Sequence, residues 1–473
     1  MSKAFKAIWS DVRQSFVTTS EIQSSHGKRS KASVSLSVAT VLLATSGLVS
    51  AAYVETGTLG DKASWETAEY NYNWGLGAMN ASSAYALGFY GQNTTTGVMD
   101  SGAWLGNPDL DTPRITATHV TGVYGSSGNR YPQSIYATIQ KGVVPTAAEG
   151  QPFTEGEEFD VKGDYTLGLN DAHGTQVTGV IGAERNGEYG HGVAFKANVV
   201  VGNTGATDNN NYGPFQDYNY YFKGYKALAD AVNAGNGEYR GGMVNNSYGT
   251  NTKIYSSGGH RLTPDEMSEL LAGSGNYDRA SAAYAVTFSG DYSFLGLNDV
   301  PGADQYSTNP SAFEWEYMYF KLKYGDKPSF LDGAYDAVKG TNVILSWAAG
   351  NQDRGTPYLK GLYPYFHPEA EKNWLNAVGV MQTRGDNDQY MQATYCKAGL
   401  AKWWSMSGPT AYPGIGTTYV TTDLENGRLT TTGFNGTSAS DPQISGAFTV
   451  LQSRYPSMTA IQVKDVMYTT ASH

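Results

Sequence analysis

The sequence predicts an α/β domain: a largely parallel central sheet flanked by helices. Two observations lead to this expectation. Short apolar segments alternate along the chain with segments whose apolar residues recur at helical spacing, as in βαβ units. Several apolar segments also end at a polar residue, as strands do when a site lies beyond their carboxyl ends.

Four apolar segments are expected to be strands of this sheet. They are residues 96–100, 198–202, 343–349 and 376–381. The first ends at Asp100, and the third leads directly into Gly350 and Asn351. Short apolar runs of this kind are typical of strands that are buried on both faces.

Two segments have the apolar spacing of a helix. The first follows His173, with apolar residues at Val177, Val180 and Ile181. The second follows Ser438, with apolar residues at Ile444, Ala447, Phe448 and Leu451. The first series falls at i, i+3 and i+4, and the second at i, i+3, i+4 and i+7. We therefore expect His173 and Ser438 to open helices.

Composition excludes several classes of function. The 473 residues are 40% hydrophobic and 16% charged, which is typical of a globular chain with one large domain or two ordinary ones. A net charge of −11 argues against nucleic acid as a partner. The single Cys396 excludes an intrachain disulfide and a multi-thiolate metal site. Neither paired histidines at metal-ligand spacing nor an Asp-x-Asp-x-Asp-Gly loop is present, so we expect no metal and no cofactor. The alternative is Ca²⁺ held by acidic loops, although solvated acids explain these loops more simply.

The first part of the chain has the pattern of a secretory signal. Its first 31 residues hold six basic and two acidic side chains, a net +4 that leaves −15 for the remainder. Residues 32–54 carry no charge and include small residues at 49–52. This pattern predicts cleavage after Ala51 or Ala52. The alternative is a membrane anchor, although its many Ser, Thr and Gly residues make a weak membrane helix.

The start of this leader has a further pattern in residues 1–9, 15–17, 20–21 and 27–29. It resembles the extended signal-peptide region of Gram-negative type V secreted proteins. The resemblance implies that residues 1–52 engage the inner-membrane secretion machinery and that an autotransporter passenger follows. Residues 53–72 are then a short lead-in.

Two stretches, residues 120–165 and 251–335, are rich in Gly, Tyr, Ser, Asn and Asp and have weak periodicity. We expect them to be surface insertions in a domain that spans residues 73–473. Their tyrosines are expected to serve loop packing rather than a ligand cage.

Four short segments carry the groups that acyl transfer needs. They are residues 100–102, 173–175, 348–351 and 436–438. Singly, each has a simpler explanation as a turn or as a surface residue at a helix start. Together they offer Ser438 as a nucleophile, His173 as its base and Asp100 as the carboxylate that orients the imidazole. The Asn351 amide and the Ser438 backbone N–H can stabilise an oxyanion.

The order and surroundings of these residues favour one class of hydrolase. Asp100, His173 and Ser438 follow one another in the order found in subtilisin. Ser438 lies in Gly-Thr-Ser-Ala-Ser and not in the Gly-x-Ser-x-Gly of the α/β-hydrolase elbow, which disfavours an esterase of that fold.

Residues from about 73 to the C-terminus resemble subtilisin-like (S8) serine peptidases, specifically their autotransporter subgroup. The four segments above carry the resemblance, together with residues 73–81, 365–369 and 374–378. It implies a three-layer subtilisin-like fold and serine endopeptidase activity through an acyl-enzyme.

Residues 246–249 resemble the family's strand that binds the substrate backbone. The resemblance implies a substrate-binding set of Ser247, Tyr248, Gly249, Ala349 and Gly350. Tyr248 and Gly249 favour a pocket that accepts large apolar side chains.

The sequence departs from the family in several places. Asp441 stands where small residues are usual, and we expect its charge to lie near the nucleophile. Cys396 lacks the partner that the subgroup commonly has near Ser405, so that disulfide cannot form. The short lead-in leaves no room for an inhibitory prodomain, and the chain shows no stem and no C-terminal β-barrel.

The sequence thus predicts a secreted or cell-surface serine endopeptidase that acts as a monomer on protein or peptide substrates. The alternative is an inactive passenger that binds or adheres to a partner through its Tyr-rich insertions. The complete triad favours the enzyme, whereas Asp441 and the missing barrel favour the alternative.

Overall fold

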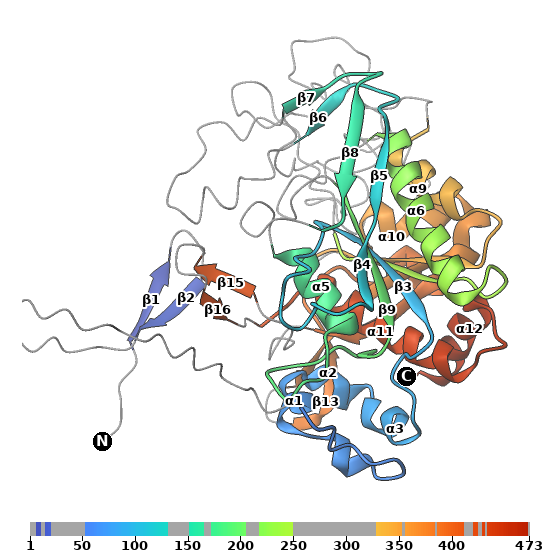
Figure 1. The fold of residues 1–473 in the computed structure, drawn as a ribbon. Helices are drawn as coiled ribbons and strands as arrows, with labels where there is room; N and C mark the ends of the chain where they lie inside the picture. The colour runs from blue at the N-terminus through green and yellow to red at the C-terminus, as the bar shows by residue number, and fades with distance from the viewer. Residues whose placement is uncertain are drawn as a thin grey trace, which may run out of the picture. The chain divides into compact units, whose positions relative to one another are not determined.

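The fold is described from a computed structural model of the chain (Figure 1). The structure describes residues 6–10, 15–19, 53–130, 151–164, 172–204, 217–248, 328–351, 355–383, 386–410, 420–423, 428–430 and 433–471. The chain divides into two compact units, residues 1–52 and 53–473. In the first, β1 (Lys6–Ser10) pairs with β2 (Ser15–Thr19) in antiparallel fashion. No helix within the described ranges is long and apolar enough to cross a membrane, and the apolar part of the leader lies outside those ranges.

The second unit is built on a sheet whose strands run in the order β13-β12-β11-β10-β3-β9-β4, with β14 beside β12. The strands are β3 (Thr95–Asp100), β4 (Ile115–Ala117), β9 (Asn198–Asn203), β10 (Gly242–Asn246), β11 (Val343–Ala348), β12 (Trp374–Thr383), β13 (Asp386–Gln392) and β14 (Ser405–Pro409). All neighbouring pairs are parallel except β12 and β13. The predicted parallel sheet is confirmed, and each of the four predicted strands is present.

Helices cover both faces of this sheet. They include α5 (His173–Gly182), α6 (Tyr218–Asn236), α9 (Phe330–Val338), α10 (Leu359–Phe366), α11 (Thr437–Arg454) and α12 (Ala460–Thr470). Side chains alternate between the faces of a strand. Within β11, Val343, Leu345 and Trp347 pack with α6, α9 and α10, whereas Ile344 packs with α11 and α12. The predicted three-layer arrangement is therefore observed (Figure 1).

The predicted lead-in is part of the folded unit. Residues 53–86 contain η1 (Lys62–Trp65), α1 (Ala68–Tyr72), α2 (Trp74–Ala78) and α3 (Ala81–Ala86). Trp65, Tyr70 and Tyr85 are buried in one aromatic cluster with Phe195. Further described elements are η4 (Pro368–Asn373), η5 (Gly399–Trp404), β15 (Val420–Asp423) and β16 (Arg428–Thr430).

The two predicted insertions differ in how far they are described. In the first, β5 (His119–Val123) pairs with β8 (Glu158–Lys162), and β6 (Gly128–Arg130) pairs with β7 (Gln151–Phe153). Tyr124 and Phe159 of this region pack on Tyr220 of α6, so tyrosine here serves packing. In the second, residues 251–327 lie outside the described ranges. Residues 330–335 belong to α9, which the capping box of Ser329 and Asp332 opens.

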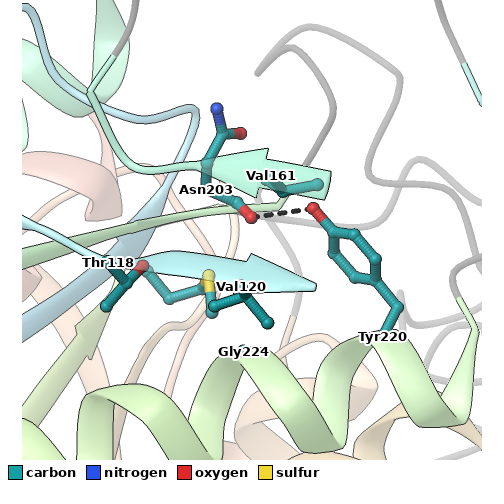
Figure 2. A pocket seen from close by; sticks show the side chains of 7 residues that line it. Thr118, Val120, Val161, Asn203, Tyr220 and Gly224 are labelled. Atoms are coloured by element: carbon teal, nitrogen blue, oxygen red, sulfur yellow. Dashed lines mark hydrogen bonds between the residues drawn. The ribbon is translucent and has the colours of Figure 1, made fainter. Parts of the chain in front are cut away.

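A small cavity lies between α6, β5, β8 and β9 (Figure 2). Its lining includes Met99, Val120 and Val161, and at its edge the Tyr220 hydroxyl donates to the Asn203 carbonyl at 2.9 Å. None of the predicted site residues lines this cavity.

Candidate active site

The topology brings the predicted site residues to one edge of the sheet. Strands β3, β10 and β11 are parallel neighbours, so their carboxyl ends lie side by side. Asp100 ends β3, Ser247 follows β10, and Ala349 to Asn351 follow β11. As predicted, His173 is the first residue of α5; Ser438 is the second residue of α11.

Asp100 and His173 form a buried pair. The imidazole Nδ1 lies 2.8 Å from Asp100 Oδ1, and that oxygen also accepts the backbone N–H of Ser101 at 2.8 Å. Asp100 is fully buried, and His173 is 8% exposed. A carboxylate on Nδ1 keeps a proton on that nitrogen, so Nε2 of the neutral ring is the atom that can accept another.

A glycine allows α5 to start close to the end of β3. A Cβ on Gly174 would lie 2.0 Å from the Gly102 carbonyl oxygen. The Gly174 N–H also donates to the Ser101 hydroxyl at 3.0 Å. These contacts fix the first turn of α5, and with it His173, against the loop that carries Asp100.

Ser438 lies in the first turn of α11, where backbone N–H groups point out of the helix. Its hydroxyl donates to the Ser247 carbonyl at 2.7 Å, and the residue is 7% exposed. Since a hydroxyl has one proton, the side chain must rotate before it can donate that proton to His173. The Ser247 carbonyl is thus an acceptor within reach of the nucleophile.

Phe434 connects the two halves of the site. Its ring meets the His173 imidazole edge-on, with centroids 5.3 Å apart. Phe434 and Ala439 share a core cluster with Val177 and Val180 of α5. The segment that leads to Ser438 therefore packs against the helix that carries His173. Nothing in the sequence pattern singles out Phe434 for this position.

Thr437 orients Asn351. The amide oxygen of Asn351 accepts the Thr437 N–H at 2.8 Å and the Thr437 hydroxyl at 3.0 Å. The Asn351 amide nitrogen is therefore the group left to face a ligand. A Cβ on Gly436, at φ +84°, would lie 2.8 Å from that nitrogen, so glycine is required there. Thr437 lies in the Gly-Thr-Ser segment, but nothing in the sequence pattern predicts this role for it.

The predicted substrate-binding residues have different surroundings. The Tyr248 side chain is buried in the core, where its hydroxyl lies 2.7 Å from that of Tyr225 and the Lys360 ammonium lies 4.1 Å from its ring centre. It does not line a pocket for apolar substrate side chains, because it fills the space between α6 and α10. Gly249 lies outside the described residues.

Ala349 and Gly350 are tied into the fold by their backbone. The Ala349 carbonyl accepts the Tyr358 N–H, and the Gly350 carbonyl accepts the Cys396 N–H. The Gly350 N–H donates to the Thr437 hydroxyl at 3.0 Å. These carbonyls thus already accept protein N–H groups. Cys396 is buried and forms no disulfide, and a Cβ on Gly350 would lie 3.0 Å from its sulfur.

Asp441 follows Ser438 by three residues in α11, and its carboxylate points to the sheet. Its carboxylate is fully buried and accepts hydrogen bonds from the Ser346 hydroxyl, the Asn246 N–H and the Ser247 hydroxyl. Burial raises the pKa of Asp441 from 3.8 to about 7, against the lowering effect of these hydrogen bonds. The side chain turns toward the sheet because the ends of β10 and β11 offer donors there.

Within the described ranges, no group of three or more His, Cys, Asp or Glu side chains is arranged to hold a metal ion.

Two parts of the chain are similar to known protein families. Residues 91–473 match the profile of the subtilase family (peptidase S8), and residues 1–50 match that of the extended signal peptide of the type V secretion system. An "Extracellular serine protease" of Serratia marcescens is 25% identical over 441 residues, which cover 89% of this chain and 33% of that protein. "Serotype-specific antigen 1" of Mannheimia haemolytica is 33% identical over 136 residues, which cover 28% of this chain and 14% of the antigen. The chain spans about a third of the length of the first of these relatives.

Among solved structures, the nisin leader peptidase NisP of Lactococcus lactis is 15% identical, with a TM-score of 0.41 over 86% of this chain and 91% of that one. Sphericase is also 15% identical, with a TM-score of 0.38 over 80% of this chain and 84% of that one.

Proposed function

Because the chain belongs to the subtilase family of serine peptidases, we propose that it is an endopeptidase that hydrolyses peptide bonds through Ser438, His173 and Asp100. The protein is secreted or displayed at the cell surface, in keeping with its extended signal peptide and its extracellular relatives. The observation that carries the proposal is the buried pair of His173 and Asp100, held beside the helix start that bears Ser438.

In the proposed reaction, the Ser438 hydroxyl attacks the scissile carbonyl carbon while His173 Nε2 takes its proton. Asp100 stabilises the resulting imidazolium through Nδ1. The oxyanion accepts hydrogen bonds from the Asn351 amide nitrogen and the Ser438 N–H. His173 then gives its proton to the leaving amine, and water hydrolyses the acyl-enzyme by the same steps in reverse.

The Ser247 carbonyl has a part in substrate binding in this proposal. It accepts a hydrogen bond from the Ser438 hydroxyl in the structure, and Ser247 directly follows strand β10. A peptide laid along Ser247 in extended form would offer a backbone N–H to the same carbonyl. That contact would release the Ser438 hydroxyl to rotate toward His173.

A fluorophosphonate probe tests the proposal, because it reacts with activated serines. The full-length chain should be labelled at Ser438, as peptide mass spectrometry would show, and Ser438→Ala should remove the label. Cleavage of an unstructured protein such as casein should disappear with the label. A correctly folded chain that is neither labelled nor active would instead favour the binding or adhesion passenger.

A further inference from the structure

Asp441 is a buried acid that the proposed reaction does not use. It lies three residues after Ser438 in α11, so both side chains leave the same face of that helix. Ser438 bonds to the Ser247 carbonyl, and Asp441 bonds to the Ser247 hydroxyl at 3.4 Å and to the Asn246 N–H at 3.2 Å. One turn of α11 thus contacts the end of β10 at three points.

The same carboxylate also reaches the neighbouring strand. Its Oδ1 accepts the hydroxyl of Ser346, whose residue is paired in register with Asn245 of β10. The Asn245 side chain donates to the Ser247 hydroxyl at 2.8 Å, and its oxygen accepts from Ser445 of α11 at 3.0 Å. Asp441 is therefore the centre of a buried polar network that joins α11 to β10 and β11.

We propose that Asp441 is a positioning residue for substrate: its carboxylate holds the Asn246–Ser247 backbone against the first turn of α11, so that a bound peptide meets Ser438 in register. The inference rests on the proposed peptidase function. Asn246 is fully buried between this carboxylate and the Tyr225 hydroxyl, which donates to its amide oxygen at 2.6 Å. Without Asp441, the Asn246 N–H and the hydroxyls of Ser346 and Ser247 lose an acceptor. The end of β10 is then able to shift.

This role is sensitive to pH, because a neutral carboxyl group accepts weaker hydrogen bonds than a carboxylate. With a pKa of about 7, Asp441 changes charge in the neutral range. The strands β10 and β11 present only amides and hydroxyls to it. Among the described residues, the titratable groups around Asp441 are Asp100 of β3, His173 of α5 and Tyr225 of α6. The charge of Asp100 raises the pKa of Asp441, and His173 acts through its bond to Asp100. Substrate should bind more tightly above pH 7 than below it.

The test compares Asp441→Ala and Asp441→Asn with the unchanged chain, each at a concentration of active sites measured by fluorophosphonate labelling of Ser438. For the labelled fraction, we expect Asp441→Ala to raise KM for a peptide substrate about tenfold, because the loss of a buried hydrogen-bond acceptor usually has an effect of this size. The kcat should change less than about threefold. The wild-type KM should fall as pH rises through 7. In Asp441→Asn, which keeps the volume and has no charge, KM should not change with pH.

Asp217→Asn is the matched control. Asp217 is also a fully buried acid, and it caps α6 by accepting the Tyr220 N–H at 3.0 Å. This variant should lower thermal stability and leave KM and its pH dependence unchanged, which separates positioning from a general loss of stability. If Asp441→Ala does not fold, Asp441→Asn still gives the pH comparison.

Two results would overturn this inference and leave the proposed function standing. One is an unchanged KM in both Asp441 variants. The other is a kcat that rises 5- to 30-fold in Asp441→Ala, which is the effect expected if the Asp441 charge opposes the oxyanion. A wild-type chain that is folded but not labelled at Ser438 would overturn the proposed function and this inference together.

Discussion

The hydrogen bond between His173 and Asp100 determines what each residue of the candidate triad can do. The carboxylate is buried and already accepts the Ser101 N–H, so it cannot rotate freely to another partner. The imidazole is held by Asp100 on one side and by the Phe434 ring on another. In the proposed reaction, a ring fixed in this way would present the same nitrogen to Ser438 in every turnover.

Ser438→Ala and His173→Ala should each abolish nearly all peptide hydrolysis, because attack and proton transfer occur in the same step. For the same reason, the double variant should be hardly less active than either single variant. Initial rates at saturating substrate measure this. Additive losses would show that the two side chains do not act together.

Asn351→Ala should lower kcat by roughly 10²–10³ and leave KM nearly unchanged, as for one oxyanion-hole donor in subtilisin. The expectation follows from Thr437, which holds the amide oxygen and so directs the amide nitrogen toward the reacting carbonyl. Thr437→Val should reproduce part of this loss, since it removes the hydroxyl and keeps the shape. A mainly raised KM in Asn351→Ala would instead indicate that Asn351 binds ground-state substrate.

The buried Asp441 should make stability fall with rising pH. Its folded-state pKa of about 7 lies above the ordinary value of 3.8, so the folded chain holds a proton that the unfolded chain has lost between these values. The favourable contribution is complete below about pH 4 and is lost as pH rises through 7. Urea unfolding between pH 4 and 8 should show a decrease on the order of 1–4 kcal/mol from this group. Asp441→Asn should remove that decrease, and an identical slope in both proteins would contradict the expectation.

At the scale of elements, the sequence predicts those helices and strands whose apolar pattern lies within a few neighbouring residues. The apolar segments of β3, β9, β11 and β12 have the composition of buried strands, and the apolar spacing after His173 and Ser438 is that of a helix. Strand β10, Gly242–Asn246, has only two apolar residues and is not among the predicted strands. The family resemblance points to residues 246–249, which share only Asn246 with β10. Helix α9 has helical spacing, but its residues 330–335 fall in the stretch 251–335, whose composition predicts an insertion.

The features that sequence analysis missed depend on partners far away along the chain. Asp441 meets Asn246, which is 195 positions earlier, and Thr437 meets Asn351, which is 86 positions earlier. Tyr248 turns into the core because Tyr225 and Lys360 surround it there. No periodicity in a single sequence reports such pairings, so neither the direction of a side chain nor its burial followed from the motif that contains it.

Arg185 ties the start of the folded unit to the end of α5. Its side chain is fully buried, and its Nε lies 3.1 Å from the Tyr53 hydroxyl and 3.1 Å from a Glu55 carboxylate oxygen. Its Nη1 donates to the Trp65 carbonyl at 3.2 Å, and the guanidinium lies 5.3 Å from the Trp65 ring centre. The helix that begins at His173 is therefore anchored at its other end to residues 53–65.

Arg185→Ala should lower the free energy of unfolding by about 3 kcal/mol, because it removes a fully buried side chain that packs on Trp65 and leaves the Trp65 carbonyl without this donor. Glu55→Gln is the matched control, since it keeps the Tyr53 and Trp65 contacts and changes a partly exposed carboxylate. It should cost less than about 1 kcal/mol. Urea unfolding of the two variants measures the difference, and equal losses would mean that the Glu55 pair carries the whole effect.

At the scale of the whole molecule, the boundary between the two compact units coincides with the predicted processing site. The first unit ends at Ala52 and the second begins at Tyr53. Tyr53 and Glu55 belong to the second unit through Arg185. A cut after Ala52 would therefore remove the leader and leave every one of these contacts in place.

Removal of the leader is the prediction that tests this organisation. The basic start, the uncharged stretch and the small residues at positions 49–52 should direct cleavage after Ala51 or Ala52. Mass spectrometry of periplasmic or surface material should then find Ala52 or Tyr53 as the first residue. Ala51→Leu with Ala52→Leu should block cleavage, because signal peptidases require small side chains before the cut. Intact Met1 or Ser2 in the membrane fraction of the unchanged chain would instead favour a membrane anchor.

Cleavage beyond Glu55 would contradict the expectation that Arg185 holds the new N-terminus, because it would release Tyr53 and Glu55, whose side chains contact the guanidinium.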